Sequence, residues 1–227
     1  MNGETTLKVI ARIQSPFPGK FGIPRQSGRV PQILSRIVFE PEYRNADALR
    51  GLEGFSHLWL LWQFSEAQRE GWSPTVRPPR LGGNQRMGVF ATRSPYRPNP
   101  IGLSCVAIKN IVLSSPEGPY IEVSGADLMD ATPIYDIKPY LPMADSIPTA
   151  TGGFAEPVRG YSLEVQDPDG LLTGIPAEDS ALIRAILAED PRPSYQTDAD
   201  RVYSFECSGY HISFRVEESK IILCNLK

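Results

Sequence analysis

The sequence predicts a mainly β protein, with an antiparallel β-barrel or curled sheet followed by a small α+β domain. Six short apolar segments in the first 126 residues are rich in β-branched side chains and are bounded by turn residues, as strands are. Strands and helices do not alternate along the sequence, and no GxGxxG motif follows a predicted strand. Both observations disfavour a Rossmann nucleotide-binding fold.

The six predicted strands differ in how clearly their residues alternate. Ile121 and Val123 alternate with polar neighbours, which indicates one buried and one exposed face. One helix-like segment, residues 45–55, interrupts the series, with Asn45 or Asp47 as its N-cap and two glycines limiting its length. The predicted strands cover residues 7–13, 35–40, 57–64, 87–92, 103–113 and 120–126.

A change in composition predicts a domain boundary. Residues 143–160 lack periodicity and are rich in Pro, Gly, Ser, Thr and Ala, which separates a domain over residues 1–145 from one over residues 155–227. Within the second domain, residues 161–166 predict a strand and residues 176–189 an amphipathic helix. Three further strands, expected to form the β-meander of a small α+β unit, are VYSFEC, HISFRV and KIILCNL.

Composition predicts a soluble cytoplasmic protein without a metal site. No apolar run approaches the roughly 20 residues that cross a bilayer, and the N-terminus does not have the pattern of a signal peptide. The three cysteines and two histidines have no spacing typical of zinc ligands, and Cys105 is expected to be a buried free thiol.

The basic residues are segregated along the chain. Residues 5–39 and 71–116 each contain six Lys or Arg residues and no Asp or Glu, although the whole chain has a net charge of −3. An acid-free run of arginines produces a local positive field, so a phosphate or a polyanion is a plausible ligand. The alternative is that these arginines pair with carboxylates from elsewhere in the chain.

The segment TRSPYRPNPIG, residues 92–102, predicts a stiff loop that displays cations. Its three prolines fix their own φ angles and push the preceding residues toward extended geometry. Two guanidinium groups on such a loop suggest an anionic ligand, and Tyr96 between them is a credible stacking surface for a splayed RNA base. By contrast, Trp59, Trp62 and Phe64 are expected to fill the barrel, and His57 to be satisfied by a backbone carbonyl.

Several segments together resemble the TrmO family, which is also called TsaA-like. The members are S-adenosylmethionine-dependent methyltransferases that methylate N6 of threonylcarbamoyladenosine at position 37 of tRNA, beside the anticodon. The resemblance implies a β-barrel methyltransferase core, a homodimer and a C-terminal domain that contacts tRNA. The segments are PRQ (24–26), GLEGFSHLWLLW (51–62), GWSPTVRPPRLGG (71–83), RMGVFATRSPYRPNPIGLS (86–104), DLMDATPIYDIKPYLP (127–142) and DPRPSY (190–195).

The resemblance also implies site residues. Asp127 and Asp130 have an alternative role, because Asx residues readily cap turns, and this role is compatible with cofactor contact. Ser65 and Glu66 depart from the commoner His-Gln pair of the family. The residues that match its cofactor-binding pattern are Pro24, Arg25, Gln26, Ser65, Glu66, Arg93, Asp127, Leu128, Asp130 and Thr132.

Four further residues are expected to contact tRNA: Tyr96, Arg97, Arg192 and Tyr195. The alternative for the last two is packing, with Tyr195 against the C-terminal helix and Arg192 paired with Glu189. The sequence selects no catalytic residue, because either a carboxylate or a backbone carbonyl could accept the N6 proton. Two other functions stay open: a non-catalytic module that binds modified tRNA or a nucleotide, and a methyltransferase for another small acceptor.

Overall fold

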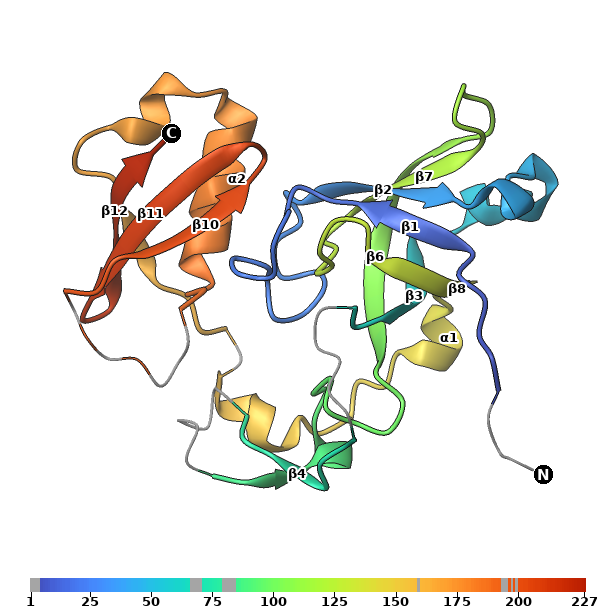
Figure 1. The fold of residues 1–227 in the computed structure, drawn as a ribbon, viewed down its shortest axis with the longest axis horizontal. Helices are drawn as coiled ribbons and strands as arrows, with labels where there is room; N and C mark the ends of the chain where they lie inside the picture. Colours follow the sequence, from blue (N-terminus) through green and yellow to red (C-terminus); the bar gives the residue numbers. More distant parts are fainter. Residues whose placement is uncertain are drawn as a thin grey trace.

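A computed structural model describes residues 5–65, 71–78, 85–158, 160–192, 196, 198 and 200–227 of the chain. Glu66 and Tyr195, two of the expected site residues, lie outside the described residues. The ribbon shows a β-barrel beside a second, smaller sheet that carries a helix, with the short strand β4 below both of them (Figure 1).

The barrel confirms the predicted antiparallel β architecture. Its strands close in the order β1-β2-β7-β6-β3-β8, and every neighbouring pair is antiparallel. Alternate side chains fill the interior, as the strand period of two requires: Leu58, Leu60 and Trp62 are buried, whereas their neighbours on β3 are less so. The strands are β1 (Ala11–Gln14), β2 (Leu34–Phe39), β3 (His57–Gln63), β6 (Ile101–Val112), β7 (Tyr120–Ser124) and β8 (Pro133–Pro139).

Three details differ from the expectation. Strand β8, which closes the barrel, was not predicted, because it begins with proline and its exposed and buried residues do not alternate. Residues 45–55 form two short 3₁₀ turns, Ala46–Leu49 and Leu52–Gly54, because Gly51 has a φ of 88° and interrupts the helix. Residues 87–92 give only the two-residue β5 (Met87–Gly88), which pairs with β4 (Thr75–Val76) outside the barrel and leads into a 3₁₀ turn, Val89–Ala91.

The C-terminal unit confirms the small α+β domain. Its sheet has the order β10-β11-β12-β9, with a meander of three antiparallel strands and β9 added in parallel. Helix α2 (Ala177–Ala188) buries Leu182, Ile183, Ile186 and Leu187 in the core of this unit. The strands are β9 (Glu164–Gln166), β10 (Tyr203–Cys207), β11 (Tyr210–Glu217) and β12 (Lys220–Leu226), and a 3₁₀ turn, Leu171–Gly174, precedes the helix.

Part of the N-terminal chain packs into the C-terminal core. Phe17, Val30 and Ile33 lie between β1 and β2 in sequence, yet they belong to the hydrophobic cluster of the C-terminal unit. Arg29 reinforces this contact with two 2.9 Å hydrogen bonds to the carboxylate of Glu189. The loop of residues 15–33 therefore joins the two units, and the division into residues 1–145 and 155–227 stays a prediction.

The connection between the units is mostly exposed and contains two short helical segments, α1 (Pro142–Asp145) and a 3₁₀ segment, Gly153–Val158. Another 3₁₀ turn, Pro41–Tyr43, follows β2. Within the described part of the chain, no helix has both the length and the apolar character needed to cross a membrane.

Candidate functional site

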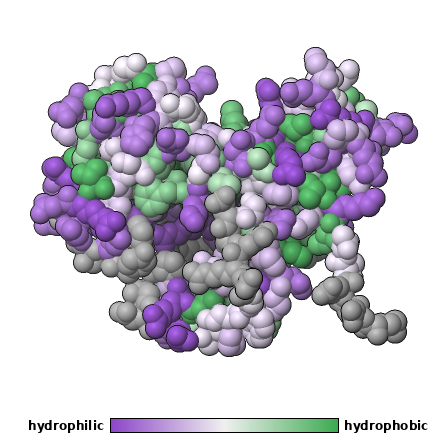
Figure 2. Space-filling model, viewed as in Figure 1, coloured by the Kyte–Doolittle hydropathy of each residue, from purple (hydrophilic) through white to green (hydrophobic). Residues whose placement is uncertain are grey.

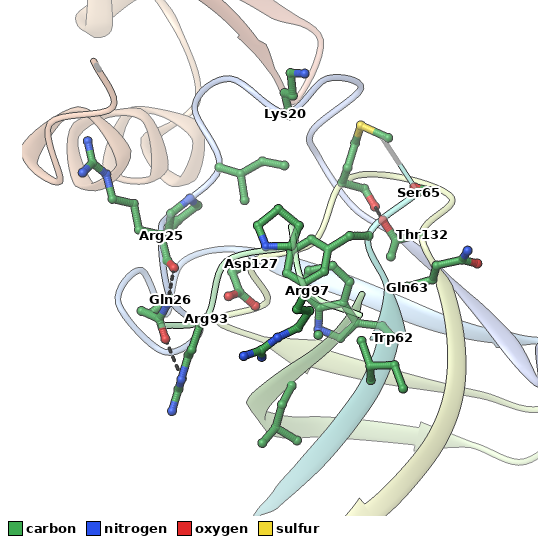
Figure 3. A pocket seen from close by; sticks show the side chains of 18 of the residues that line it. Lys20, Arg25, Gln26, Trp62, Gln63, Ser65, Arg93, Arg97, Asp127 and Thr132 are labelled. Carbon is green, nitrogen blue, oxygen red and sulfur yellow. Dashed lines mark hydrogen bonds between the residues drawn. The ribbon is translucent and has the colours of Figure 1, made fainter. Parts of the chain in front are cut away.

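A pocket of about 590 Å³ lies where the loop of residues 15–33, the proline-rich loop and one end of the barrel meet (Figure 3). Its size is typical of cofactor and small-molecule sites. Figure 3 shows Arg25, Gln26 and Arg93 on one side of the pocket and Trp62, Gln63, Ser65 and Thr132 on the other, with Asp127 and Arg97 between them. The described lining also includes Lys20, Ile23, Pro24, Phe64, Pro95, Tyr96, Ile101, Gly102, Leu103 and Met129.

Asp127 is the only carboxylate among the described residues that line this pocket. Its Oδ1 accepts a 2.5 Å hydrogen bond from the hydroxyl of Ser104, which in turn accepts a 2.9 Å bond from the indole Nε1–H of Trp62. Because a serine hydroxyl has one hydrogen, Trp62 fixes the direction of the Ser104 hydroxyl toward Asp127. Burial raises the pKa of Asp127, while the Ser104 hydrogen bond and the Arg93 charge act in the opposite direction.

Glycine is required where the indole of Trp62 crosses the neighbouring strand. Trp62 of β3 is paired with Gly102 of β6, and a Cβ at residue 102 would lie 2.2 Å from the ring. The absent side chain lets the ring lie over β6 with Nε1 toward Ser104, two residues along that strand. Phe64 supports the ring from the other side, with the two ring centroids 4.3 Å apart.

A hydrogen-bond chain joins the PRQ segment to the proline-rich loop. Arg93 Nη1 donates to Gln26 Oε1 at 2.5 Å, and Gln26 Nε2 donates to the backbone carbonyl of Arg25 at 2.5 Å (Figure 3). Arg25 Nη2 donates to the backbone carbonyl of Arg192 at 2.8 Å, so the chain extends to the C-terminal unit. Segments that are far apart in the sequence thereby present their guanidinium groups at one rim.

The proline-rich loop is rigid for two reasons: its three prolines and its own side-chain hydrogen bonds. Thr92 and Ser94 hydroxyls accept from the backbone N–H groups two residues further on, at 3.2 and 3.3 Å. Arg97 braces the same loop by donating to the carbonyls of Val89 and Thr92, at 3.3 and 3.0 Å, while it lines the pocket. Tyr96 is half-buried in the pocket wall.

The DLMDAT segment divides into parts with different roles. Asp127 and Thr132 line the pocket, but Leu128 is buried in the barrel core. Asp130 accepts a 2.9 Å hydrogen bond from the backbone N–H of Ser15 and is followed by Ala131 at a φ of 61°. Neither Leu128 nor Asp130 is among the residues lining the pocket, and the Asp130 side chain ties the segment between β7 and β8 to the backbone that follows β1, which is neither the cofactor contact nor the local turn cap that the sequence suggested.

Arg192 is mostly buried and makes an ion pair that the sequence did not predict. Its Nε lies 3.0 and 3.2 Å from the two carboxylate oxygens of Asp190, and its side chain is 16% exposed. Asp190 also accepts a 3.0 Å hydrogen bond from Tyr161. The alternative pairing of Arg192 with Glu189 is wrong, because Arg29 occupies that carboxylate.

Sequence reasoning missed several residues of the site, among them Ser104, Gly102, the pocket-wall role of Trp62, and Ile101 and Leu103. The run LSCVAI predicted a strand, but a serine within it carries no signal for a carboxylate 23 residues later. Trp62 is buried, as expected of barrel filling, and it also lines the pocket. His57 lies elsewhere and is exposed; its Nδ1 is 2.8 Å from the Ser56 hydroxyl, not from a backbone carbonyl.

The two acid-free stretches behave differently. In residues 5–39, four of the basic side chains pair with carboxylates: Lys8 with Glu42, Arg12 with Glu40, Arg29 with Glu189 and Arg36 with Glu122. Among the ion pairs of the described residues, none uses a basic side chain from residues 71–116. The two stretches therefore differ in the ion pairs that their described residues make. No group of His, Cys, Asp and Glu able to hold a metal ion occurs in the described parts of the chain.

Comparison with known proteins supports a single family. The tRNA-methyltransferase O N-terminal domain matches residues 12–146, and the TrmO C-terminal domain matches residues 173–227. The tRNA (adenine(37)-N6)-methyltransferase of Escherichia coli K12 is 42% identical over 218 residues, which are 92% of each chain. A putative S-adenosylmethionine-dependent methyltransferase of Pseudomonas aeruginosa is 41% identical over 82% of this chain and 81% of its own.

A solved structure of TrmO from Pseudomonas aeruginosa has the same fold. It superposes with a TM-score of 0.76 at 29% identity and covers 99% of both chains. The sequence matches span the barrel and the C-terminal sheet, and the structural match extends over both together. The chain belongs to the tRNA-methyltransferase O family.

Proposed function

We propose that this protein uses S-adenosylmethionine to methylate N6 of threonylcarbamoyladenosine at position 37 of tRNA, next to the anticodon. The observation that carries the proposal is the 42% identity, over 92% of both chains, to a relative named tRNA (adenine(37)-N6)-methyltransferase. The pocket supports it independently, because its polar groups suit the cofactor. A relative from Pseudomonas aeruginosa is itself named a putative S-adenosylmethionine-dependent methyltransferase.

The described residues of the pocket fit S-adenosylmethionine. The cofactor has a carboxylate, which suits the guanidinium of Arg93, and an ammonium group and ribose hydroxyls, which suit the buried carboxylate of Asp127. Its adenine requires an apolar slot, which Ile101 and Leu103 can supply beside the indole of Trp62. Pro24, Gln26, Ser65 and Thr132 complete the proposed cofactor site, and Arg25 supports it from the rim.

Bound S-adenosylmethionine supplies an electrophilic methyl group. The chain's own residues must place the acceptor N6 roughly 3–3.5 Å from that methyl, exclude water and draw away the N6 proton. The N6 lone pair of threonylcarbamoyladenosine is delocalised into both the ring and the carbonyl, so placement matters more than for a free amine. The stiff loop that carries Arg93 and Arg97 suits this task, because the prolines and the bonds of Arg97 hold it in one conformation.

The RNA contacts belong to the same proposal. Tyr96 and Arg97 line the pocket and are proposed to meet the modified base or its threonyl carboxylate. Arg192 and Tyr195 are proposed as tRNA contacts of the C-terminal unit, with Arg192 linked to the pocket rim through its carbonyl and Arg25. We further propose that the protein acts in the cytoplasm as a homodimer.

The deciding experiment is methyl transfer from labelled S-adenosylmethionine to total tRNA. We expect incorporation into tRNA that carries threonylcarbamoyladenosine and none into tRNA from cells that cannot make this nucleoside. Equal labelling of both preparations would mean that another nucleotide is the acceptor. Cofactor binding without any methyl transfer would favour a binding module instead.

Arg93→Ala tests the cofactor site directly. Loss of a hydrogen bond to a charged group costs ~1.5–3 kcal/mol, so the Kd for S-adenosylmethionine should rise by about 10-fold to 150-fold in titration calorimetry. Arg86→Ala is the matched control, because it removes an arginine of the same acid-free stretch that donates to the Thr75 hydroxyl and does not line the pocket. An unchanged Kd in Arg93→Ala would remove Arg93 from the site.

A further inference from the structure

Two aromatic side chains next to the pocket are exposed and in contact with each other. Trp72 is 51% exposed and Phe90 is 75% exposed, and their rings are nearly parallel, with centroids 6.2 Å apart and planes at 24°. Figure 2 shows hydrophobic atoms beside strongly hydrophilic ones in the region where Figure 1 draws β4. Two large rings stacked in solvent are an unusual surface and mark a binding function.

The backbone presents these rings in a defined way. Trp72 precedes β4 and Phe90 follows β5, and the two strands pair in antiparallel register, with Thr75 opposite Gly88. Val89 is buried, and its N–H donates to the carbonyl of Pro74 at 3.0 Å. The next residue, Phe90, is exposed. The ring pair therefore lies beside the paired strands β4 and β5.

The same turn is tied to the pocket. Arg97 donates to the carbonyl of Val89, immediately before Phe90, and it lines the cofactor pocket. A second cavity, of about 350 Å³, is lined by Phe90, Arg97, Pro98, Asn99 and Ile101. The two cavities share Arg97 and Ile101, so the ring pair adjoins the candidate active site.

Charge identifies the kind of partner. The segment that carries both rings, residues 71–116, has six basic residues and no acidic one. Arg86 donates to the neutral hydroxyl of Thr75, and Arg97 donates to backbone carbonyls, so these contacts do not neutralise their charges. Aromatic rings beside unneutralised arginines match single-stranded RNA, whose bases stack on the rings while its phosphates meet the cations.

We propose that Trp72 and Phe90 form a stacking platform for an anticodon-loop nucleotide that neighbours the base being methylated. This inference rests on the proposed function and extends it to a substrate contact outside the pocket. Tyr96, the aromatic that the sequence favours for stacking, is half-buried in the pocket wall. The platform is the exposed pair, and it holds the loop while the target base enters the site.

The test compares Trp72→Ala and Phe90→Ala with wild type in binding to an unmodified tRNA anticodon stem-loop. Base–aromatic stacking of ~1–3 kcal/mol corresponds to binding that is about 5-fold to 150-fold weaker. Trp72→Phe keeps a ring and should retain most of the affinity. Met143→Ala, at a side chain that is 96% exposed and lies outside both cavities, is the matched control and should bind normally.

Two further measurements, S-adenosylmethionine affinity and sedimentation, separate the outcomes. S-adenosylmethionine affinity should be unchanged in both alanine variants; a wild-type protein that binds neither this cofactor nor tRNA would refute the proposed function itself. Sedimentation should show the same oligomeric state for all variants. If the alanine variants bind the stem-loop as wild type does, the platform is not an RNA surface. If the variants instead change the oligomeric state, the two rings form a contact between copies of this chain.

Discussion

Replacing Ser104 by alanine should test the hydrogen-bonded chain beneath the pocket. Ser104 is fully buried, and its hydroxyl joins the indole of Trp62 to the carboxylate of Asp127. The substitution removes a hydrogen bond to a charged group and leaves the Trp62 N–H without its partner, losses of ~1.5–3 and ~1–3 kcal/mol. Because water from the pocket can replace part of the bond to Asp127, we expect a total near the lower end, ~2–3 kcal/mol at neutral pH.

The loss should depend on pH in a defined direction. Burial raises the pKa of Asp127 and the Ser104 hydrogen bond lowers it, so Ser104→Ala raises this pKa further. A carboxyl group whose pKa is higher in the folded than in the unfolded state destabilises the protein as pH rises from the unfolded value through the folded value. The cost of the substitution should therefore be largest at neutral pH and should decrease in acid, where Asp127 is protonated in both states.

Urea denaturation at about pH 7 and about pH 4.5 measures this difference. Asp127→Asn is the control, because an amide does not titrate, and adding Ser104→Ala to it should give a cost that is the same at both pH values. The reasoning would be refuted if the single Ser104→Ala variant lost the same free energy at both pH values, or lost none.

Three further predictions follow from the packing. Gly102→Ala places a Cβ 2.2 Å from the Trp62 ring, so it should lower the free energy of unfolding by ~1–3 kcal/mol and weaken cofactor binding. Gly19→Ala is the control, because its Cβ would meet open space, and it should change neither quantity. Arg29→Ala removes the paired bonds to Glu189 and should cost ~1–2 kcal/mol, with partial rescue by lysine; an unchanged melting temperature would show that the loop of residues 15–33 docks without this pair. Burial raises the pKa of Cys207 to about 11, so an alkylating reagent at mildly alkaline pH should spare Cys207 in the folded protein and modify it in urea. Equal labelling of Cys207 in both states would contradict its burial.

The sequence by itself determined the elements whose signals are local. The alternation of Ile121 and Val123 with polar neighbours predicts a strand with one buried face, because successive side chains on a strand point to opposite sides, and β7 confirms it. The i,i+4 spacing of Leu182 and Ile186 predicts helix α2 in the same way. The prolines between residues 92 and 102 predicted a stiff loop, and the structure adds the side-chain bonds that brace it.

The tertiary structure decided which of these elements meet. Ser104 and Asp127 are 23 residues apart, and Arg29 and Glu189 are 160 residues apart, so no periodicity within one segment reveals either pair. The same applies to Trp72 and Phe90, which become neighbours only because β4 pairs with β5. The sequence supplied the two acid-free stretches. Only the folded chain shows that the basic side chains of the first pair largely with carboxylates, whereas no ion pair among the described residues uses a basic side chain of the second, because ion pairs depend on distance in space and not along the chain.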